Sequence, residues 1–530
     1  MKHSIALHCA VFAVLLVALG GPALAQNEVE HPRYTWDFKP ENGDWNNPAN
    51  WTPEGAPDTQ KERAVLGRSQ ITTLTVAPDD FIASVEFTPG ADRYTINGGL
   101  FFNDLGVINN SGVVQTFDGD FGFDHGAAAG SLVIYNVTGF VDFIGDAGSG
   151  TFNIATGARA TFFFDGENTG NGGSATFNNA GSVSFFKDTH AGQATFINYG
   201  GDSFGAQGAS FLFSRAFGDS STIILNGGSV FGARGARMFL DKSSLFSATV
   251  VANGGAGGAG SGGEILFNNS GGNSARVEVF GNGSIDFSRR DDANNSIGSV
   301  EGDGTVYLGD GTLTIGSNNL NTSFGGSLTE TGGAHGGGPG AISKTGTGTL
   351  TLTSANDYSG GTTVGSGSLF VNNTTGSATG SGPVNVVGGA LGGTGTISGA
   401  VTVGDGSSLA TLDPGASNST IGALTLQATL ALDGNSAYAA QIDSDALAAD
   451  DLIADGVTIG SGVQIVLADL GATILPKGTS FTLINNTSGA AISGTFNNLT
   501  DGTTISIGNN TYQANYEGGD GNDLTLTVVP

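Results

Sequence analysis

The chain repeats one short unit, seen in TFINYGG (195–201), IILNGGSVF (223–231), VVANGGAG (250–257) and VEVFGNGSIDF (277–287). In each unit a short apolar segment runs into a turn rich in Asn and Gly. The Asn of the turn recurs after 28, 27 and 29 residues, at Asn198, Asn226, Asn253 and Asn282. Because Asn and Gly tolerate positive φ angles, these residues predict sharp corners at fixed places. Similar units precede this stretch at 107–114, 133–143 and 176–186.

Apolar and polar residues alternate within the units. Val183 and Phe185 alternate with Ser182 and Ser184, which predicts strands with one buried face. Short strands, glycine corners and a spacing of 27–29 residues favour an all-β fold, a right-handed parallel β-helix over residues 97–420. Stacked turns would share one continuous core. The alternative, an array of β-sandwiches, predicts antiparallel hairpins in domains of about 100 residues.

Composition excludes several classes of protein. Of 530 residues 91 are Gly, and the formal net charge is −29. Gly costs about 1 kcal/mol at each helical site, which argues against a helical protein. A nucleic-acid-binding protein needs a basic surface, and this chain is acidic. Collagen needs Gly at every third position, and no such period is present.

The N-terminus is predicted to be a signal peptide, residues 1–25. An apolar segment at 9–20 is followed by Ala23-Leu24-Ala25, so cleavage before Gln26 is expected. The alternative, a transmembrane anchor, needs about 20 apolar residues, and the segment is shorter. The only Cys of the chain, Cys9, would leave with this peptide.

The two ends differ in composition from the repeats. Residues 26–96 hold all three tryptophans, Trp36, Trp45 and Trp51, and are expected to cap the first turn. The alternative for these rings is a carbohydrate-binding platform. Residues 421–530 are expected to form a closing β region. Within it, QIDSDALAADDLIADG (441–456) is predicted to be a solvated acidic loop, with calcium binding as the alternative.

One segment carries a specific motif. Residues 343–373, SKTGTGTLTLTSANDYSGGTTVGSGSLFVNN, closely resemble the passenger-associated transport repeat, also called the autotransporter-associated β-strand repeat. The positions that match are Lys344, Gly346, Gly348, Leu350, Leu352, Asn356, Tyr358, Gly360, Gly361, Thr362, Val364, Gly367 and Leu369. This resemblance implies a secreted or surface-displayed β-helical passenger, often an adhesin or a scaffold, from a bacterium.

Autotransporters of this type end in a membrane β-barrel of about a dozen amphipathic strands. The sequence that follows the repeat ends at Pro530 without such strands, so 421–530 is expected to contain no barrel. Two alternatives follow: the chain uses a different exporter, or it belongs to a passenger-like family that never had a barrel.

Residues able to do chemistry are sparse. Four His remain after residue 25: His31, His125, His190 and His335. None has metal-ligand spacing, and Asp188 with His190 is expected to form a polar corner rather than a catalytic pair. GGDGNDLTL (518–526) resembles one copy of a calcium-binding nonapeptide, but such sites need successive copies, so a tight turn is expected.

The densest charged segment is IDFSRRDD. Its Asp286, Arg289, Arg290, Asp291 and Asp292 are the candidates for a glycan-active site, and a solvated corner is the preferred interpretation. GGAGGAGSGG (254–263) lacks the Lys and the helix of a phosphate-binding loop, which indicates a flexible corner.

We therefore expect a non-enzymatic, structural or adhesin-like passenger, extracellular or on the cell surface, with no catalytic residue, cofactor or metal ion. Its expected partners are cell-surface glycans or other surface proteins, and no segment of the mature chain suits an integral membrane helix. The alternative is a β-helix polysaccharide lyase or glycoside hydrolase. It would need carboxylates and bases in a row on one exposed face.

Overall fold

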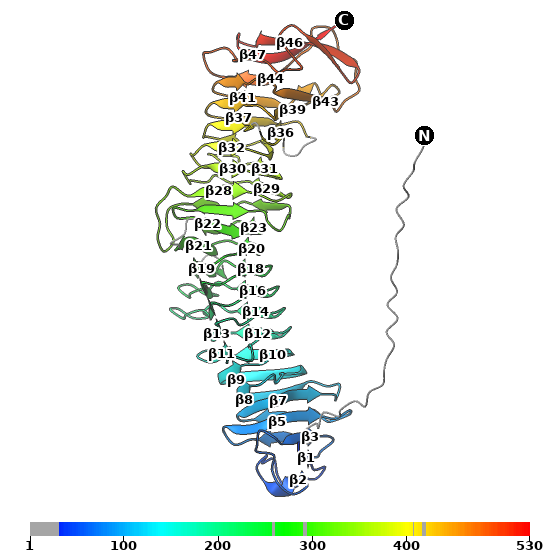
Figure 1. The fold of residues 1–530 in the computed structure, drawn as a ribbon, viewed down its shortest axis with the longest axis vertical. Coiled ribbons are helices and arrows are strands. Elements are labelled where there is room, and N and C mark those ends of the chain that lie inside the picture. The colour runs from blue at the N-terminus through cyan, green and yellow to red at the C-terminus, as the bar shows by residue number, and fades with distance from the viewer. Residues whose placement is uncertain (1–30, 257–259, 290–293, 406, 416–419) are drawn as a thin grey trace, which may run out of the picture.

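The computed structural model describes residues 31–256, 260–289, 294–405, 407–415 and 420–530. The predicted signal peptide, 1–25, therefore lies outside the described residues. The described chain winds into one long rod, from the N-terminal end at β1 (Arg33–Trp36) to the C-terminal end at β47 (Asp523–Val529) (Figure 1). Its strands pair in parallel from turn to turn, which confirms the predicted β-helix.

Each turn contributes to three parallel ladders in succession. The first ladder begins with β4 (Thr73–Thr75), β6 (Thr95–Asn97), β8 (Gln115–Phe123), β9 (Ser131–Phe143) and β10 (Ser149–Ile154). It continues through β12 (Thr176–Asn179), β14 (Thr195–Asn198), β16 (Thr222–Leu225), β18 (Thr249–Ala252), β20 (Arg276–Val279), β23 (Ser299–Gly302) and β26 (Thr322–Phe324). It ends with β29 (Thr349–Leu352), β31 (Ser368–Val371), β33 (Gly389–Gly393), β36 (Ala410–Pro414), β39 (Ser436–Asp443) and β43 (Gln464–Asp469).

The second ladder shares the long strands β8 and β9 and lies beside the first. After β9 it contains β11 (Arg159–Phe162), β13 (Ser182–Phe186), β15 (Ser210–Ser214), β17 (Arg237–Asp241), β19 (Glu264–Asn268), β21 (Ser284–Arg289), β24 (Thr305–Tyr307) and β27 (Ser327–Thr329). A later parallel group comprises β34 (Thr396–Ile397), β37 (Ala423–Leu426), β41 (Asp451–Ala454) and β44 (Ser480–Asn486).

The third ladder is narrow in the middle of the rod. It starts with β1, β3 (Arg63–Leu66), β5 (Asp80–Phe87) and β7 (Leu100–Asn109). From Gly106 to Gly271 it consists of single bridged residues, one in each turn. It widens again as β22 (Asn294–Ile297), β25 (Thr312–Ile315), β28 (Ala341–Lys344), β30 (Thr362–Val364), β32 (Val384–Val386), β35 (Val401–Val403), β38 (Leu430–Leu432) and β42 (Val457–Ile459).

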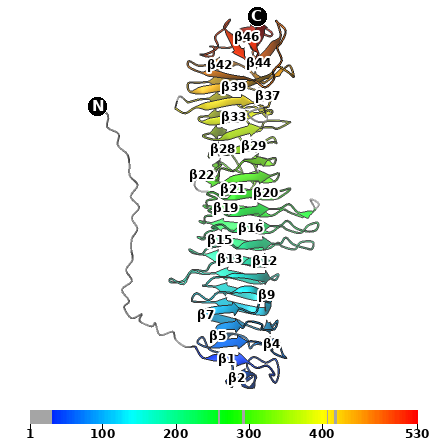
Figure 2. The same cartoon turned by 90° about the vertical axis from the view of Figure 1, so that its right-hand side faces the viewer.

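Turn length varies along the rod. Thr195 pairs with Thr222, Thr222 with Thr249 and Thr249 with Arg276, so each of these turns takes 27 residues. Thr176 pairs with Thr195, and that turn takes only 19. The longer turns contain loops between the first and second ladders, at 200–208 and 227–235, with the described residues 254–256 and 260–262 at the same place in the next turn. These loops project from the rod beside β16 (Figure 2). The 27–29-residue spacing therefore includes these loops and is no general period.

The recurring Asn residues act differently from the prediction. The φ angle is not positive at Asn198, Asn226 or Asn253. Their side chains bond between turns instead: the Asn253 Nδ2 donates to the Asn226 Oδ1 at 2.9 Å, and the Asn198 Oδ1 accepts from the Asn179 Nδ2 at 2.8 Å. The amide group, which both donates and accepts, explains why Asn recurs at these corners.

Aromatic rings dominate the core of the N-terminal half. Neighbouring rings of the first ladder stack with centroids 4.7–5.2 Å apart, and the series is Phe117, Tyr135, Phe152, Phe177 and Phe196. A second series, with centroids 4.1–5.3 Å apart, is Phe102, Phe123, Phe143, Phe162 and Phe185. Rings of the two series meet edge to face, as Phe143 and Phe152 do at 82°. Such pairs add about 0.5–1.5 kcal/mol each beyond the burial of their area.

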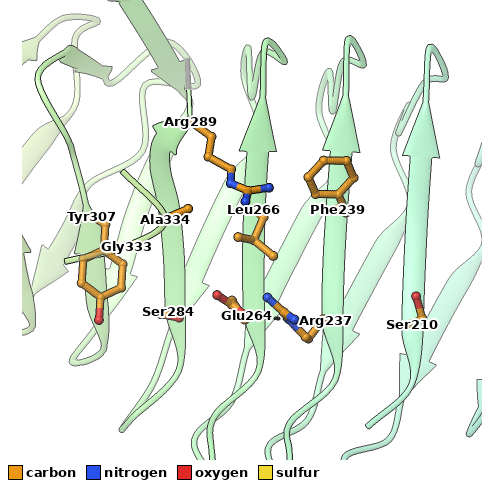
Figure 3. Close-up of a pocket in the computed structure, with 10 residues that line it drawn as sticks. All are labelled: Ser210, Arg237, Phe239, Glu264, Leu266, Ser284, Arg289, Tyr307, Gly333 and Ala334. Atoms are coloured by element: carbon orange, nitrogen blue, oxygen red, sulfur yellow. Dashed lines mark ion pairs between the residues drawn. The ribbon is translucent and has the colours of Figure 1, made fainter. Parts of the chain in front are cut away.

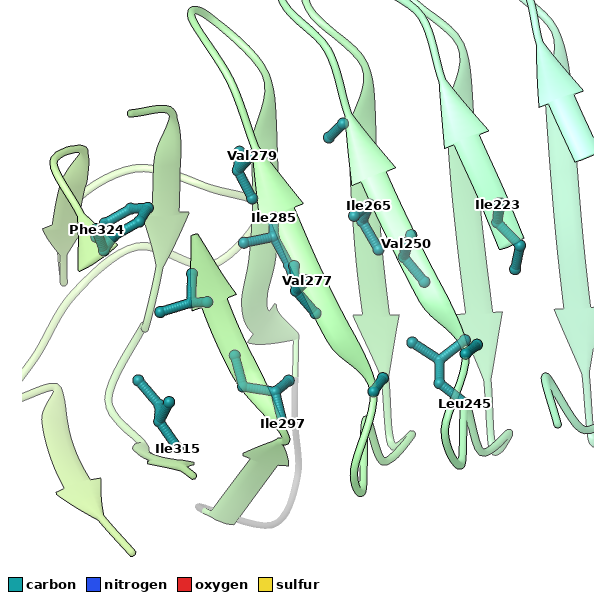
Figure 4. Packing of buried hydrophobic residues seen from close by; sticks show 14 of the residues in the cluster. Ile223, Leu245, Val250, Ile265, Val277, Val279, Ile285, Ile297, Ile315 and Phe324 are labelled. Atoms are coloured by element: carbon teal, nitrogen blue, oxygen red, sulfur yellow. The ribbon is translucent and has the colours of Figure 1, made fainter. Parts of the chain in front are cut away.

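Aliphatic side chains take over the same positions further along. Phe196 is followed by Ile223, Val250 and Val277 in register. All four are fully buried. Figure 4 shows Ile223, Val250 and Val277 pointing into the interior between the ladders. Each turn buries its apolar residues only because the next turn covers them, so the core is continuous.

The N-terminal end is closed by the tryptophans. Trp36, Trp45 and Trp51 are at most 2% exposed, and Trp51 meets the other two edge to face at 5.0 and 4.8 Å. Each indole N–H donates to a backbone carbonyl. The short helix η1 (Pro48–Asn50) and β2 (Trp51–Thr52) belong to this cap, and β2 pairs antiparallel with β1. Buried rings offer no platform to a sugar, so that alternative is wrong.

Antiparallel strands close the other end. β47 pairs antiparallel with both β44 and β46 (Asn510–Gly518), and β45 (Thr504–Ile507) pairs with β46. β40 (Ala448–Ala449) folds back on β39. Parallel pairing extends beyond both ends of 97–420, from β1 with β3 to β41 with β44. In the described chain no helix is long or apolar enough to cross a membrane.

The predicted solvated loop at 441–456 is wrong for most of the segment, in which only the turn at 445–447 and Asp455 are exposed. Asp451 begins β41, and Asp450 is fully buried. The Asp450 carboxylate accepts the backbone N–H groups of Gly422 and Gln441 at 2.8 and 2.7 Å. Burial is the main cause that raises its pKa to about 6. Asp450 therefore satisfies backbone donors inside the rod, whereas Asp445 and Asp455 face water.

In the segment 343–373, alternate residues point inward. Leu350 and Leu352 are at most 1% exposed, whereas Thr351 between them is partly exposed. We expect Leu352→Asp to lower the stability of the rod by several kcal/mol, because it buries a carboxylate without a partner. Thr351→Asp is the matched control and should have a mild effect. Chemical denaturation and protease sensitivity compare the two; equal resistance would contradict the inward assignment.

A second prediction concerns Lys344, which is 1% exposed and donates only to backbone carbonyls, those of Thr345, Gly346 and Ser366. Burial lowers its pKa to about 8. The unfolded chain therefore holds this proton more tightly than the native one, and stability should rise with pH from about 8 to about 10. The gain is at most about 1.4 kcal/mol per pH unit.

Denaturation at about pH 7.5 and about pH 9.5 measures this gain. Lys344→Met should abolish it, whereas Lys477→Met, at an exposed lysine, should retain it. Equal pH dependence in the Lys344→Met variant and the unmodified chain would refute the assignment.

Candidate functional site

A trough lies on the outer surface of the second ladder. It has a volume of about 700 Å³ and crosses β15, β17, β19, β21 and β24 (Figure 3). Its lining residues are Ser210, Arg237, Phe239, Glu264, Leu266, Ser284, Arg289, Tyr307, Gly333 and Ala334. An adjoining hollow shares Arg237, Glu264 and Ser284 and continues toward the loops at 227–235 and 254–262.

Outward-facing residues of the second ladder form the floor of the trough. Residues paired from turn to turn share a row, and Phe239 lies in register with Leu266. Leu266 pairs with Asp286, and Asp286 pairs with Tyr307. The outward row of the second ladder is therefore apolar at Phe239 and Leu266, where polar residues would be expected on a solvated face.

Two arginines provide the charge. The Arg237 Nε lies 2.6 Å from the Glu264 Oε2, and these residues are neighbours in register across β17 and β19. Arg289, at the end of β21, is exposed, and its guanidinium points over Leu266 into the trough (Figure 3). In the described part of the chain Arg289 has no ion-pair partner.

A glycine-rich strap, residues 330–340, covers one side of the trough. Asp286 anchors it: the Asp286 Oδ2 accepts the backbone N–H of Ala334 at 2.7 Å, and the Oδ1 accepts that of Ser288 at 2.8 Å. The His335 N–H donates to the Ser288 Oγ at 2.9 Å. The ring of Tyr307 lies against Gly332, where a Cβ would come within 2.7 Å of it.

The neck of the strap is held by Glu330. Its carboxylate accepts the backbone N–H groups of Gly340 and Ser359 at 3.0 and 2.8 Å, and the Ser359 hydroxyl as well. Partial burial opposes ionisation of Glu330, but these hydrogen bonds outweigh it and hold the pKa below its ordinary value.

The candidate residues of IDFSRRDD separate in the structure. Asp286 is 1% exposed and engaged by the strap, so the expected solvated corner is wrong for this residue. Arg289 is exposed, as a solvated corner requires. Arg290, Asp291 and Asp292 lie outside the described residues. The trough itself was missed because Phe239, Leu266 and Tyr307 are far apart in sequence, and only turn-to-turn register brings them together.

The histidines lie apart from one another. His190 is bonded to Asp219, not to Asp188, with the Nδ1 3.0 Å from the Asp219 Oδ1, and its ring packs on Phe217 at 4.8 Å. His31 lies 3.3 Å from Asp104. Across the described ranges, no group of three His, Cys, Asp or Glu side chains gathers as a metal site would require.

GGDGNDLTL forms a turn before β47. Asp523 starts that strand and is buried, and its Oδ1 accepts the Asn486 backbone N–H at 2.9 Å. This carboxylate therefore has a structural partner within the C-terminal cap, in agreement with the expected tight turn.

We expect Asp286→Ala to release the strap, since it removes the acceptors of two backbone donors, at a local cost of about 1–3 kcal/mol. Hydrogen exchange should accelerate at Ala334 and its neighbours in 331–340, while the core strands keep their protection. Asp310→Ala, at an exposed carboxylate nearby, is the control. Unchanged exchange in the Asp286→Ala variant would show that the strap is held by other contacts.

Comparison with known proteins agrees with the resemblance seen in the sequence. The family model of the passenger-associated transport repeat matches residues 342–371. In the structure this segment spans β28 to β31, and its apolar residues Leu350, Leu352, Val364, Leu369 and Val371 are all buried.

Two known proteins are similar to the chain. The Adhesin BmaC autotransporter of Brucella suis biovar 1 (strain 1330) is 49% identical over 72 residues, which are 14% of this chain and 2% of that protein. The crystal structure of the Haemophilus influenzae Hap adhesin aligns with 86% of this chain and 64% of its own, at 11% identity and a TM-score of 0.24, too low to support a shared fold. The chain thus carries a passenger-associated transport repeat, and over 72 residues it is similar to an adhesin autotransporter.

Proposed function

We propose that the chain is a secreted or surface-displayed passenger that serves as a non-catalytic, adhesin-like rod. The observation that carries this proposal is the passenger-associated transport repeat built into a continuous β-helix. The 49% identity to a stretch of an adhesin autotransporter supports the adhesive role. This chain spans only 2% of that relative's length, so the role is inferred from a shared segment.

The rod suits display. The turns are bonded to their neighbours through two or three ladders, which makes an elongated body without disulfides or metal ions in the described chain. The net charge of −29 keeps such a body soluble and limits self-association. Loops and outward side chains then remain available for contact with a partner.

The trough supports a binding role rather than catalysis. Glycoside hydrolysis needs two carboxyl groups that face the bond to be cleaved. Glu264 is paired with Arg237, and Asp286 is buried beneath the strap. Neither carboxylate is thus free to act as a general acid or base, and no observation favours the lyase or hydrolase alternative.

We further propose the domain division 1–25, signal peptide; 26–96, N-terminal cap; 97–420, β-helix; and 421–530, C-terminal β region. The tryptophan cluster and the antiparallel strands β44 to β47 support the two terminal regions. Ala23-Leu24-Ala25 supports cleavage before Gln26.

Export and adhesion are tested together in the producing cell. We expect the protein in the surface or culture fraction, with Gln26 as its first residue by mass spectrometry. Beads coated with the purified chain should adhere to cells or extracellular matrix more than beads coated with an acidic protein of equal charge. Retention in the cytoplasm, or adhesion equal to the control, would contradict the proposal.

A further inference from the structure

We propose that the trough on the second ladder binds an acidic polysaccharide and recognises the carboxylate groups of that ligand. This inference rests on the adhesin-like function proposed above and assigns the class of ligand. Its principal contacts are Arg289 for the carboxylate, and Phe239 and Tyr307 for the sugar faces.

Charge along the chain is the first argument. Residues 187–290 contain eight Lys and Arg and seven Asp and Glu, in a protein whose net charge is −29. Seven of the ten lining residues, from Ser210 to Arg289, lie in this nearly neutral stretch. An anionic ligand would meet less repulsion in this stretch than along the strongly acidic parts of the rod.

The state of the charged groups is the second argument. Glu264 is neutralised by Arg237, and Asp286 is buried with its oxygens bonded to the backbone. Arg289 is exposed and has no ion pair in the described ranges. A guanidinium in this state can donate two parallel hydrogen bonds to a carboxylate, the geometry that arginine favours.

The shape and lining of the trough favour a polymer of sugars. It crosses five successive turns, and the hollows on either side share residues with it: Arg237 with one and Arg289 with the other. Ser210 and Ser284 provide hydroxyls along one wall. Partly exposed Phe239 and Tyr307 present ring surface, which suits the apolar faces of sugars.

A peptide is the less favoured ligand. Peptides that bind to sheets add a strand to an exposed edge. The strands β17, β19 and β21 are bonded on both sides, so the trough has no edge to offer. Nucleic acid is excluded by the overall charge, because its phosphates require a basic surface.

Binding of the purified full-length chain to polygalacturonate, measured by titration calorimetry at low salt, tests the proposal. We expect binding that Arg289→Gln weakens about tenfold, the loss typical of one charged hydrogen-bonding contact. Arg93→Gln makes the same charge change at an exposed arginine outside the trough and should leave affinity unchanged. Phe239→Ala should weaken binding further, with the fold checked by circular dichroism.

Three other polymers show whether binding depends on the carboxylate groups, on the sugar rings or on charge alone. Neutral dextran should not bind. Dextran sulfate that binds more tightly than polygalacturonate would overturn the assignment to carboxylates, and equal binding of poly-glutamate would overturn the assignment to sugars. The site is refuted if polygalacturonate does not bind, or if Arg289→Gln and Arg93→Gln weaken it equally. Either result leaves the adhesion test on beads unaffected, so the two proposals can fail separately.

Discussion

The structure depends on the stacking of inward side chains directly on their equivalents in the next turn. Parallel pairing without offset places Phe143 on Phe162 and Phe162 on Phe185, with centroids 4.6 and 4.1 Å apart. Because no turn can bury its own apolar residues, stability accumulates through neighbours rather than within a turn. Both ends then need covers, which the tryptophan cluster and the antiparallel C-terminal strands provide.

The alternation of residues was sufficient to predict the strands, the buried face and the parallel β-helix. Val183 and Phe185 point inward as the pattern requires, and so do Leu350 and Leu352. Turn length was less predictable, because the loop at 200–208 adds residues to a turn without changing the register of its strands. The fold could therefore be inferred from local pattern, whereas the period could not.

The charged and polar interior could not be predicted either. Asp450, Asp286 and Lys344 look in sequence like surface residues, yet each is buried and bonded to backbone groups. Where strands end, the backbone leaves donors and acceptors without ladder partners, and these side chains satisfy them. The trough depends on the same fact, because the buried Asp286 fixes the strap that forms one of its sides.

Because of the three projecting loops, the length of the sequence does not determine the length of the rod. Adding residues at 200–208 or 227–235 leaves the rise from one turn to the next unchanged, since the ladders on either side keep their pairing. Insertions and substitutions at this corner should therefore cost the fold little stability. Two of these loops already carry an exposed aromatic residue: Phe204 is 79% exposed and Phe231 is 73% exposed. A scaffold built in this way can change what it touches while its interior stays fixed.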